Sequence, residues 1–310
     1  MNSKDFTLVV PVYNDAKYLR KTLDSCVNQV EVLWLYDNCS TDGSTEICAE
    51  YAAKYEHVEH VLHEENLGAF ENFKLPLFKC KTEYFMWFGA HDVMGENYVQ
   101  PLLKSLRENL DAGLAVGKIF HMNEDDSPRK KVTDLSEWDE ALQNEDDGLK
   151  RLAAFIKNHF GSRKHDSFLL HGIWRTESLR KAWVDIPCLA YDDAILGRAA
   201  AYDKIIYNNE AIFYARWFRK TRKKADEPKR IFHGGEVPTD GTMTRNILVL
   251  SIIDAIMEIA HQRQDAKDVF SLVKLVEKYA VSPKRARKRR LHTRIGMILG
   301  AIIGVALCVF

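Results

Sequence analysis

The stretch FTLVVPVYNDAKYLRKTLDS, from Phe6 to Ser25, decides the fold class of this chain. A run rich in apolar and β-branched residues covers Phe6–Val12, which is typical of a buried strand. From Asp15 to Gln29, apolar residues such as Leu19 and Leu23 then recur at helical spacing. A strand that leads directly into an amphipathic helix is the beginning of a βαβ unit.

The same alternation continues to about residue 90. Short apolar runs at 32–36, 57–63 and 84–88 predict three further strands, and helical patterns separate them, the last at 68–80. Strands that alternate with helices of this length predict an α/β fold. We expect a mostly parallel central sheet that is covered by helices.

The composition restricts the class of protein. Lys and Arg together number 44, as do Asp and Glu, so the chain as a whole is not biased toward nucleic acid. The six cysteines form no CxxC pair, which argues against a zinc site or a disulfide framework and suits a reducing compartment. The N-terminal residues contain no apolar signal segment, so we expect the bulk of the protein in the cytosol. The acidic stretch 123–150 is expected to be a solvated loop.

Polar residues follow each of the four predicted strands. They are Tyr13 and Asn14, then Asp37 and Asn38, then Asn66, and finally His91 with Asp92. Ligands of open parallel sheets bind beyond the carboxyl ends of the strands, so these residues predict one site at one edge of the sheet. The first strand is followed by neither GxGxxG nor a P-loop, which argues against a dinucleotide-binding or P-loop site.

Three motifs, in this order and spacing, resemble the inverting family 2 glycosyltransferases of bacterial polysaccharide synthesis. They are VVPVYNDAKYLRKTLDS at Val9–Ser25, YDNCSTDGST at Tyr36–Thr45 and ENLGAFENF at Glu65–Phe73. The resemblance covers about the first hundred residues well and continues less evenly to about residue 216. It implies a GT-A-like nucleotide-sugar-binding sandwich over residues 1–215. A helical extension at 216–283 and a membrane-attached tail at 284–310 would follow.

The resemblance assigns the nucleotide to the first three strand ends. Asp37 corresponds to an aspartate that accepts a hydrogen bond from the base, a role that suits a group unable to donate. Pro11, Tyr13 and Asn14 would shape the floor under the base, and Asn66 would join them from the third strand end. The alternatives are that Asp37 caps the turn at 40–44 and that Tyr13 is a core aromatic residue.

The fourth strand end departs from the family's pattern. The family places an acidic cluster there, often Asp-x-Asp-Asp, which holds a divalent cation against the diphosphate. This chain reads Gly89-Ala90-His91-Asp92, so Asp92 is the best metal candidate. His91 would be a second ligand, which suits Mn²⁺ better than Mg²⁺, or else a hydrogen-bonded neighbour of the ligands. The departure leaves the identity of the metal, and the dependence on one, open.

The segment YDDAILGRAAAYDKI, at Tyr191–Ile205, resembles the part of the family that carries the catalytic base. By position, Asp193 matches the base that takes the proton of the acceptor hydroxyl, and Asp192 is its neighbour. The alternative for two adjacent carboxylates at this place is stabilisation of a helix N-terminus.

Two neighbouring segments complete the expected site. In HGIWRTESLRKAW, at His171–Trp183, the first residue and Trp174 would border the acceptor pocket, although Trp174 also fits a core position. Arg216 or Arg219 would close over the diphosphate, whereas Arg222–Lys224 also fits a solvated basic face. His233 is a more remote metal candidate.

The C-terminal sequence predicts attachment to a membrane. The uncharged run 295–310 would form a helix about 24 Å long, against a hydrocarbon core of roughly 30 Å, so it either spans marginally or lies in the interface. The basic cluster at 284–294 would remain on the cytosolic side and attract anionic lipids. Gly296, Gly300 and Gly304 form two overlapping GxxxG units, which suggests a homodimer through the tail.

Together these features predict an enzyme on the cytoplasmic face of a membrane, the bacterial inner membrane. It would move a sugar from a nucleotide-sugar donor to a hydroxyl of a glycan or lipid-linked glycan in one inverting displacement. Two alternatives remain open at this point. One is a non-catalytic, nucleotide-binding relative, which Gly89 and His91 favour. The other is a nucleotidyltransferase, which would usually carry a glycine-rich loop with Lys or Arg after the first strand, and this chain has none.

Overall fold

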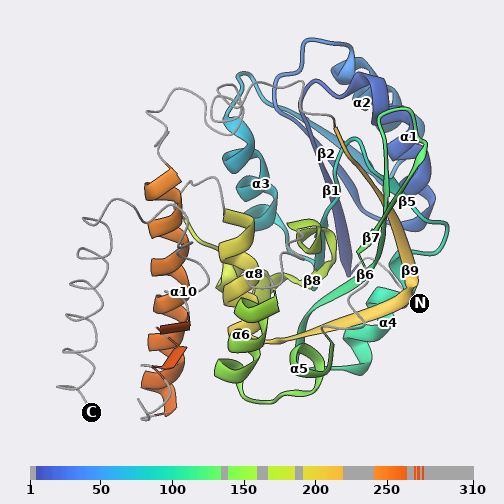
Figure 1. Ribbon diagram of the computed structural model, residues 1–310. Coiled ribbons are helices and arrows are strands. Elements are labelled where there is room, and N and C mark those ends of the chain that lie inside the picture. Colours follow the sequence, from blue (N-terminus) through green and yellow to red (C-terminus); the bar gives the residue numbers. More distant parts are fainter. Residues whose placement is uncertain are drawn as a thin grey trace.

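A computed structural model provides the structure of the chain (Figure 1). It describes residues 5–133, 139–158, 167–185, 191–218, 241–263, 269, 271–272 and 274–275. The predicted division at residues 215 and 283 stays a prediction.

The N-terminal part is a parallel sheet, as the alternating pattern predicts. Its strands are β1 (Phe6–Val12), β2 (Leu33–Asp37), β3 (Val58–Leu62) and β4 (Tyr84–Trp87), in the order β3-β2-β1-β4. Helices α1 (Ala16–Cys26), α2 (Ser44–Lys54) and α3 (Gly68–Lys79) connect them. Leu8 of β1 pairs with Leu33 on one side and with Met86 on the other, so β1 lies inside the sheet. The strands β2 and β4 lie on opposite sides of β1, so the strand order reverses at β1. A ligand site is expected at such a reversal.

The sheet as a whole is mixed, and the expectation of a mostly parallel sheet is wrong for its second half. The further strands are β5 (Val93–Met94), β6 (Ala112–Met122), β7 (Pro128–Thr133), β8 (Ile173–Arg175) and β9 (Lys204–Arg216). The strand β8 lies between β4 and β6 and is antiparallel to both, whereas β6 and β9 are parallel. A strand of three residues is too short to show a period, which is why the sequence did not predict it.

The acidic stretch 123–150 is not one solvated loop. It contains the turn that joins β6 to β7, the strand β7 itself, and the helix α5 (Asp139–Asn144). It ends in the first turn of α6 (Gly148–Ile156), where the Asp147 carboxylate accepts hydrogen bonds from the backbone N–H groups of Leu149 and Lys150. Carboxylates of this stretch therefore support local structure.

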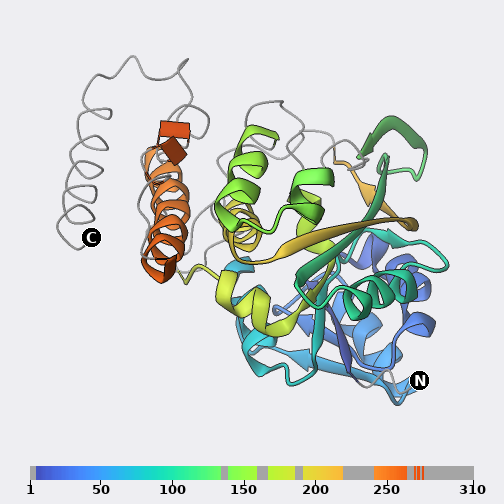
Figure 2. The same ribbon diagram turned by 90° about the horizontal axis from the view of Figure 1, so that it is seen from below.

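Two cores form on opposite faces of the sheet, because successive strand residues point to opposite sides. In β4, Met86 contributes to the core shared with α1, α2 and α4 (Val99–Glu108), whereas Phe85 and Trp87 contribute to the other. The second core is shared with α3, α7 (Thr176–Ala182) and α8 (Tyr191–Tyr202). The sheet is thus covered on both faces, as Figure 2 shows from below.

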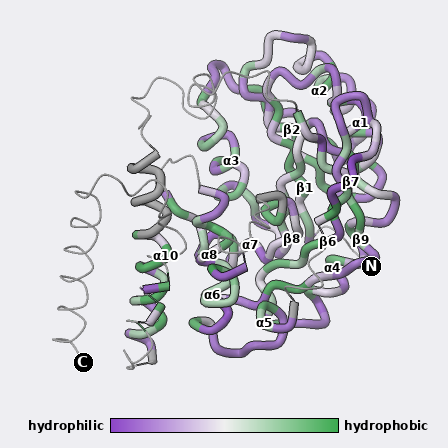
Figure 3. Tube along the Cα trace, in the orientation of Figure 1, coloured by the Kyte–Doolittle hydropathy of each residue, from purple (hydrophilic) through white to green (hydrophobic). Residues whose placement is uncertain are grey.

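The helix α10 (Gly241–Arg263) lies beside α8 and α6, away from the sheet (Figures 1 and 2). Its Asp254 pairs with Arg198 at 2.7 Å and its Glu258 accepts a hydrogen bond from the Tyr202 hydroxyl. Figure 3 accordingly shows both hydrophilic and hydrophobic residues along it. None of the helices in the described ranges combines the length and the apolar character needed to cross a bilayer. The predicted tail at 284–310, with Gly296, Gly300 and Gly304, lies outside the described residues.

Candidate active site

A cavity of about 280 Å³ lies beyond the carboxyl ends of β1 and β4, where the strand order reverses. Four groups of residues line it: the end of β1, the residue after β2, the first turns of α3, and the segment after β4. Two further side chains close it. The lining residues are Pro11, Val12, Tyr13, Asp15, Asn38, Ala69, Asn72, Phe73, Gly89, Ala90, His91, Asp92, His171 and Tyr191.

At the end of β1, the structure brings two of the predicted nucleotide residues, Pro11 and Tyr13, to the cavity. Asn14 does not line it. Its backbone is left-handed, with φ of 55°, and its side-chain oxygen accepts a hydrogen bond from the N–H of Thr41 at 2.8 Å. Asn14 therefore ties the end of β1 to the turn after β2 and shapes the floor indirectly.

Asp37, the last residue of β2, is not among the residues that line the cavity. Its side chain is fully buried, and its two oxygens accept hydrogen bonds from the N–H of Ser40 at 3.0 Å and the hydroxyl of Thr45 at 2.5 Å. Burial by itself raises the pKa of Asp37, but the nearby His60 ring, 3.6 Å away, and the hydrogen bonds from Ser40 and Thr45 outweigh it and leave the pKa below its ordinary value. These contacts are those of a turn cap, and the contact with a base stays a prediction.

One group of three metal-ligating side chains stands out among the described residues, and it is not the predicted one. Ligand atoms of Asp37, Cys48 and His60 lie within 4.8 Å of one another. Burial raises the pKa of the Cys48 thiol well above its ordinary value, so it stays protonated at neutral pH. Because Asp37 already accepts two hydrogen bonds, this cluster supports the turn after β2.

Asn38 is a lining residue, and Asn66 holds it in place. The Asn38 amide donates to the side-chain oxygen of Asn66 at 2.8 Å, and its own oxygen accepts from the N–H of Leu67 at 2.8 Å. Asn66 also accepts from the N–H of Gly68, the first residue of α3. The predicted residue Asn66 therefore anchors the start of α3 and does not line the cavity.

Sequence reasoning missed Ala69, Asn72 and Phe73, which line the cavity from α3. All three belong to the motif ENLGAFENF, and their spacing places them on one face of the helix. The helical period of that motif was therefore the available signal. Asp15, the residue after Asn14, was missed as well.

The segment after β4 brings the predicted metal residues together. Asp92 is 1% exposed, and one of its oxygens, Oδ1, accepts a hydrogen bond from the N–H of Arg216 at 2.7 Å. The other oxygen, Oδ2, is buried and has no hydrogen-bond partner among the described residues. Such an orphaned carboxylate oxygen is costly unless a ligand satisfies it.

Gly89 leaves the space that this oxygen faces. A Cβ atom at Gly89 would lie 2.6 Å from Oδ2 of Asp92 and 3.8 Å from Nε2 of His91. The other ring nitrogen of His91, Nδ1, lies 3.4 Å from a carboxylate oxygen of Asp15. A carboxylate behind one ring nitrogen typically orients a histidine toward a metal at the other. One oxygen and one nitrogen beside this space fit a divalent cation.

The predicted diphosphate residue Arg216 does not line the cavity. Its guanidinium lies beneath the segment after β4, where Nε donates to the carbonyl of His91 at 2.7 Å. It also pairs with Asp126 at 2.6 Å, and its centre lies 4.4 Å from the centre of the Tyr18 ring. The other named candidates, Arg219, Arg222–Lys224 and His233, lie outside the described residues.

The acidic pair Asp192–Asp193 occupies the first turn of α8 but does not line the cavity. Asp193 is 7% exposed, and its backbone N–H donates to a side-chain oxygen of Asp192 at 3.0 Å. Tyr191, the preceding residue, does line the cavity and packs edge-on against Phe73. The pair is therefore next to the cavity, and its role as the base stays a prediction.

On the acceptor side, His171 lines the cavity and Trp174 does not. The Nδ1 of His171 donates to the carbonyl of Trp87 at 2.9 Å, which fixes the orientation of the ring. Trp174 is fully buried, and its indole N–H donates to the carbonyl of Leu170. Trp174 is thus a core residue, the alternative that the sequence left open.

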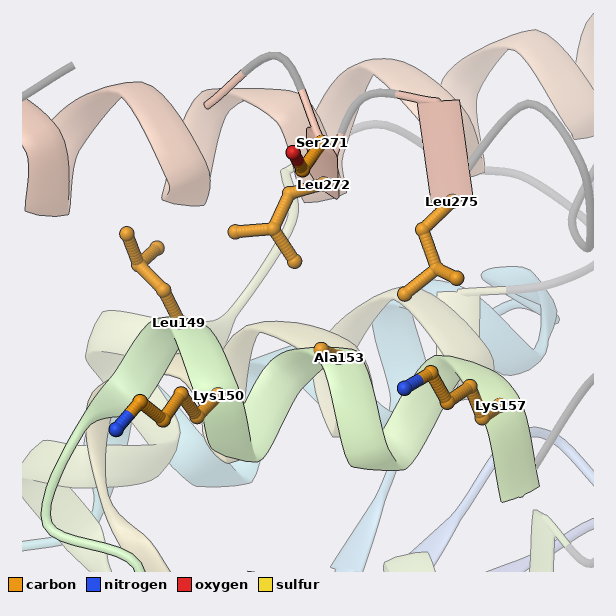
Figure 4. Close-up of a pocket in the computed structure, with 7 residues that line it drawn as sticks. All are labelled: Leu149, Lys150, Ala153, Lys157, Ser271, Leu272 and Leu275. Atoms are coloured by element: carbon orange, nitrogen blue, oxygen red, sulfur yellow. The ribbon is translucent and has the colours of Figure 1, made fainter. Parts of the chain in front are cut away.

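A second cavity, of about 270 Å³, lies between α6 and the residues Ser271, Leu272 and Leu275 (Figure 4). Leu149, Leu272 and Leu275 point into it, and Lys150 and Lys157 lie along its α6 side. Its described lining contains no carboxylate and no imidazole, so it lacks the groups that distinguish the first cavity.

Comparison with known proteins gives a family match over the N-terminal half of the chain. Residues 7–168, a little over half of the chain, match the family model described as glycosyl transferase family 2. The chain is 26% identical over 217 residues to the glycosyltransferase GlyA of Streptococcus pneumoniae, covering 67% of this chain and 30% of that protein. It is 27% identical over 144 residues to the putative teichuronic acid biosynthesis glycosyltransferase TuaG of Bacillus subtilis, covering 44% and 57% respectively.

The fold is also found in a solved structure. The crystal structure of S. aureus TarS residues 1–349 in complex with UDP-GlcNAc matches with a TM-score of 0.59 and 17% identity, covering 91% of this chain and 74% of that one. This likeness shows the fold, which is GT-A-like. The chain spans less than two thirds of the length of the curated relatives named above.

Proposed function

Because this chain belongs to glycosyl transferase family 2, we propose that it transfers a sugar from a nucleotide-sugar donor to a hydroxyl group of an acceptor. The observation that carries the proposal is the buried, unpartnered oxygen of Asp92, which faces the space beside Gly89 in the cavity. A site for a nucleotide diphosphate needs a fixed positive charge near the phosphates. An orphaned carboxylate at the end of β4 is placed to hold the cation that supplies it.

The donor that we propose is a uridine diphosphate sugar. The similar TarS fragment has been solved with UDP-GlcNAc. In the present chain, Pro11 and Tyr13 would lie under the base, and Asn38 and the first turns of α3 would form the opposite wall. Asp37, which caps the turn after β2, would accept a hydrogen bond from the base if the turn opens toward the ligand.

Asp92 and His91 would hold the divalent cation. Mn²⁺ suits a nitrogen and an oxygen ligand better than Mg²⁺ does, because Mg²⁺ prefers oxygen ligands throughout. When bound, the cation would offset the charge that develops on the leaving diphosphate. The chain itself orients the two ligands, through the contact of Asp15 with His91 and the N–H of Arg216 on Asp92.

We propose a single inverting displacement with Asp193 as the general base. In this step the acceptor oxygen bonds to the anomeric carbon, the bond to the diphosphate breaks, and the carboxylate takes the hydroxyl proton. Asp192 would hold the start of α8 through its hydrogen bond with the N–H of Asp193. His171 and Tyr191 would line the path of the acceptor.

The acceptor that we propose is a glycan or lipid-linked glycan of the bacterial cell envelope. Similar Bacillus proteins include the putative teichuronic acid biosynthesis glycosyltransferase TuaG, the minor teichoic acid biosynthesis protein GgaA and a poly(ribitol-phosphate) beta-glucosyltransferase. We further propose that residues 284–310 attach the enzyme to the cytoplasmic face of the membrane, with a homodimer through the glycine face of the tail. Attachment to the membrane would keep the enzyme close to an acceptor that is itself bound to the membrane.

A donor screen tests the proposal. The purified chain is incubated with a panel of nucleotide sugars, with and without Mn²⁺, and release of the nucleoside diphosphate is measured. We expect release from a UDP-sugar that depends on Mn²⁺ and falls at least about 100-fold in Asp92→Asn. Glu108→Gln, an exposed residue of α4, is the matched control and should behave as wild type. Tight binding of a UDP-sugar with no release from any donor, with or without an acceptor preparation, would favour the non-catalytic alternative.

A further inference from the structure

Arg216, the last residue of β9, connects the segment after β4 with the turn between β6 and β7. Its backbone N–H donates to Oδ1 of Asp92 at 2.7 Å, and its side-chain Nε donates to the carbonyl of His91 at 2.7 Å. One arginine therefore holds both of the neighbouring residues that would bind the cation. It holds Asp92 through its main chain and His91 through its side chain.

The other end of the guanidinium is held by the turn between β6 and β7. The Nη1 atom of Arg216 donates to the carbonyls of Asn123 and Glu124, each at 3.2 Å, and pairs with the carboxylate of Asp126 at 2.6 Å. The Arg216 side chain is only 1% exposed. A buried guanidinium that loses its ionic partner is strongly destabilised, so these contacts are not easily exchanged for a ligand.

The turn itself has an unusual conformation at the residue that makes the ion pair. Asp126 has a φ of 67°, in the left-handed region that a residue with a side chain rarely adopts. One of its oxygens pairs with Arg216 and the other with Lys21 of α1 at 2.8 Å. Strained residues of this kind persist where the surrounding contacts determine them, and here those contacts are the two cations.

We propose that Arg216 is a positioning residue for the cation site and that its ion pair with Asp126 keeps it in position. The arrangement turns Oδ1 of Asp92 toward the backbone of β9 and leaves Oδ2 facing the space beside Gly89. The inference rests on the proposed function, since it assumes that Asp92 binds a cation. It also gives Arg216 a role different from a direct contact with the diphosphate.

Direct measurement of Mn²⁺ binding tests this role without relying on transfer activity. Free and bound Mn²⁺ are distinguished by electron paramagnetic resonance, in titrations with Mn²⁺ alone and with Mn²⁺ plus UDP. We expect Asp126→Asn to weaken Mn²⁺ binding about tenfold, because the guanidinium loses its anchor and no longer holds the carbonyl of His91 in place. UDP affinity without cation should stay within about twofold of wild type. Arg20→Met is the matched control. Arg20 lies on the same helix as Lys21, and the substitution removes its exposed ion pair with Glu50 of α2.

Two further comparisons separate positioning from a general loss of structure. In a His91→Ala background, Asp126→Asn should cause little further loss of Mn²⁺ affinity, because the side chain that the anchored segment orients is already gone. Arg216→Lys keeps the charge but not the fork, and should weaken Mn²⁺ binding at least as much as Asp126→Asn. Asp126 is 44% exposed, so its conservative variant is expected to fold even if variants of Arg216 do not.

The outcomes distinguish the inference from the proposed function. If the wild-type protein binds no Mn²⁺ either alone or with UDP, the cation site of the proposed function is wrong, and the inference with it. If the wild type binds Mn²⁺ and Asp126→Asn binds it equally well, the inference alone is overturned. A loss of cation-independent UDP affinity that equals the loss of Mn²⁺ affinity would also overturn it, because Arg216 would then bind the diphosphate itself.

Discussion

Replacement of Gly89 by alanine tests whether the space beside Asp92 is a ligand site. The added Cβ would lie 2.6 Å from Oδ2 of Asp92, closer than carbon and oxygen atoms approach without a bond, and 3.3 Å from its Cγ, which is a tight contact. Asp92 would have to move, and it is 1% exposed with its other oxygen held by the N–H of Arg216 at 2.7 Å. The cheapest adjustment turns Oδ2 away from the space and weakens that hydrogen bond.

The size of the effect follows from these contacts. A hydrogen bond to a charged group contributes about 1.5–3 kcal/mol, and each 1.4 kcal/mol corresponds to about a tenfold change in an equilibrium constant. We therefore expect Gly89→Ala to bind Mn²⁺ about 10- to 100-fold more weakly than wild type, with a matching loss of donor turnover at limiting Mn²⁺. The two quantities are measured by calorimetry in the presence of UDP and by release of the nucleoside diphosphate.

A second glycine provides the control. A Cβ at Gly197 of α8 would lie 3.3 Å from a side-chain carbon of Ile252, in the core and away from the cavity. Gly197→Ala should change the melting temperature without changing the affinity for Mn²⁺. If Gly89→Ala binds Mn²⁺ as tightly as wild type, the space beside Asp92 is not the cation site. Room for a cation would then no longer explain why a glycine stands at position 89, and the non-catalytic alternative would gain support.

Four other expectations follow from the same site. Asp193→Asn should bind donor normally and lose transfer by about 10²–10⁴-fold, with a much smaller loss in Asp192→Asn. A larger loss at Asp192, or a product with retained anomeric configuration by NMR, would contradict this. Asp37→Ala should weaken UDP binding by about 1.5–3 kcal/mol in calorimetry, and unchanged affinity would remove Asp37 from the nucleotide site. Because the pKa of Asp37 is below its ordinary value in the folded chain, its stabilising contribution is present at neutral pH and is lost as the pH falls through that lower pKa. Urea unfolding at pH 7 and pH 3 should therefore show a smaller loss of stability in Asp37→Asn than in wild type. Deletion of 284–310 should release the protein from membranes with donor hydrolysis intact, and a truncated protein that still sediments with vesicles would point elsewhere.

Much of the N-terminal half was predictable from the sequence, because its signals are local. The strands at 6–12, 33–37, 58–62 and 84–87 lie within one or two residues of the predicted runs, as buried strands and amphipathic helices have characteristic periods. In open parallel sheets, ligands bind beyond the carboxyl ends of the strands, so the polar residues at these ends could be expected to form a site at one edge. Pro11, Tyr13, His91 and Asp92 do line the cavity there.

The tertiary structure decided which of the polar strand-end residues face the cavity. Asp37 and Asn66 were predicted as ligand residues because of their positions, but their side chains hold the turn after β2 and the start of α3. Asn72, which no strand end predicts, lines the cavity from the next helix. The direction of a side chain depends on hydrogen-bond partners that a strand-end position does not specify.

The contacts of Arg216 were beyond reach of the sequence for a related reason. It meets Asp92 and the turn that contains Asp126 only because β9 returns, parallel to β6, across the sheet and places these distant segments together. The three-residue strand β8 lies between β4 and β6 and so determines where β6 and β9 join the sheet. It is too short to show a period in the sequence. The sequence by itself determined the local elements and the edge at which a ligand binds, because both follow from short-range patterns. Only the tertiary structure decided which charged groups meet there, because these pairings depend on the order of strands that are far apart in the chain.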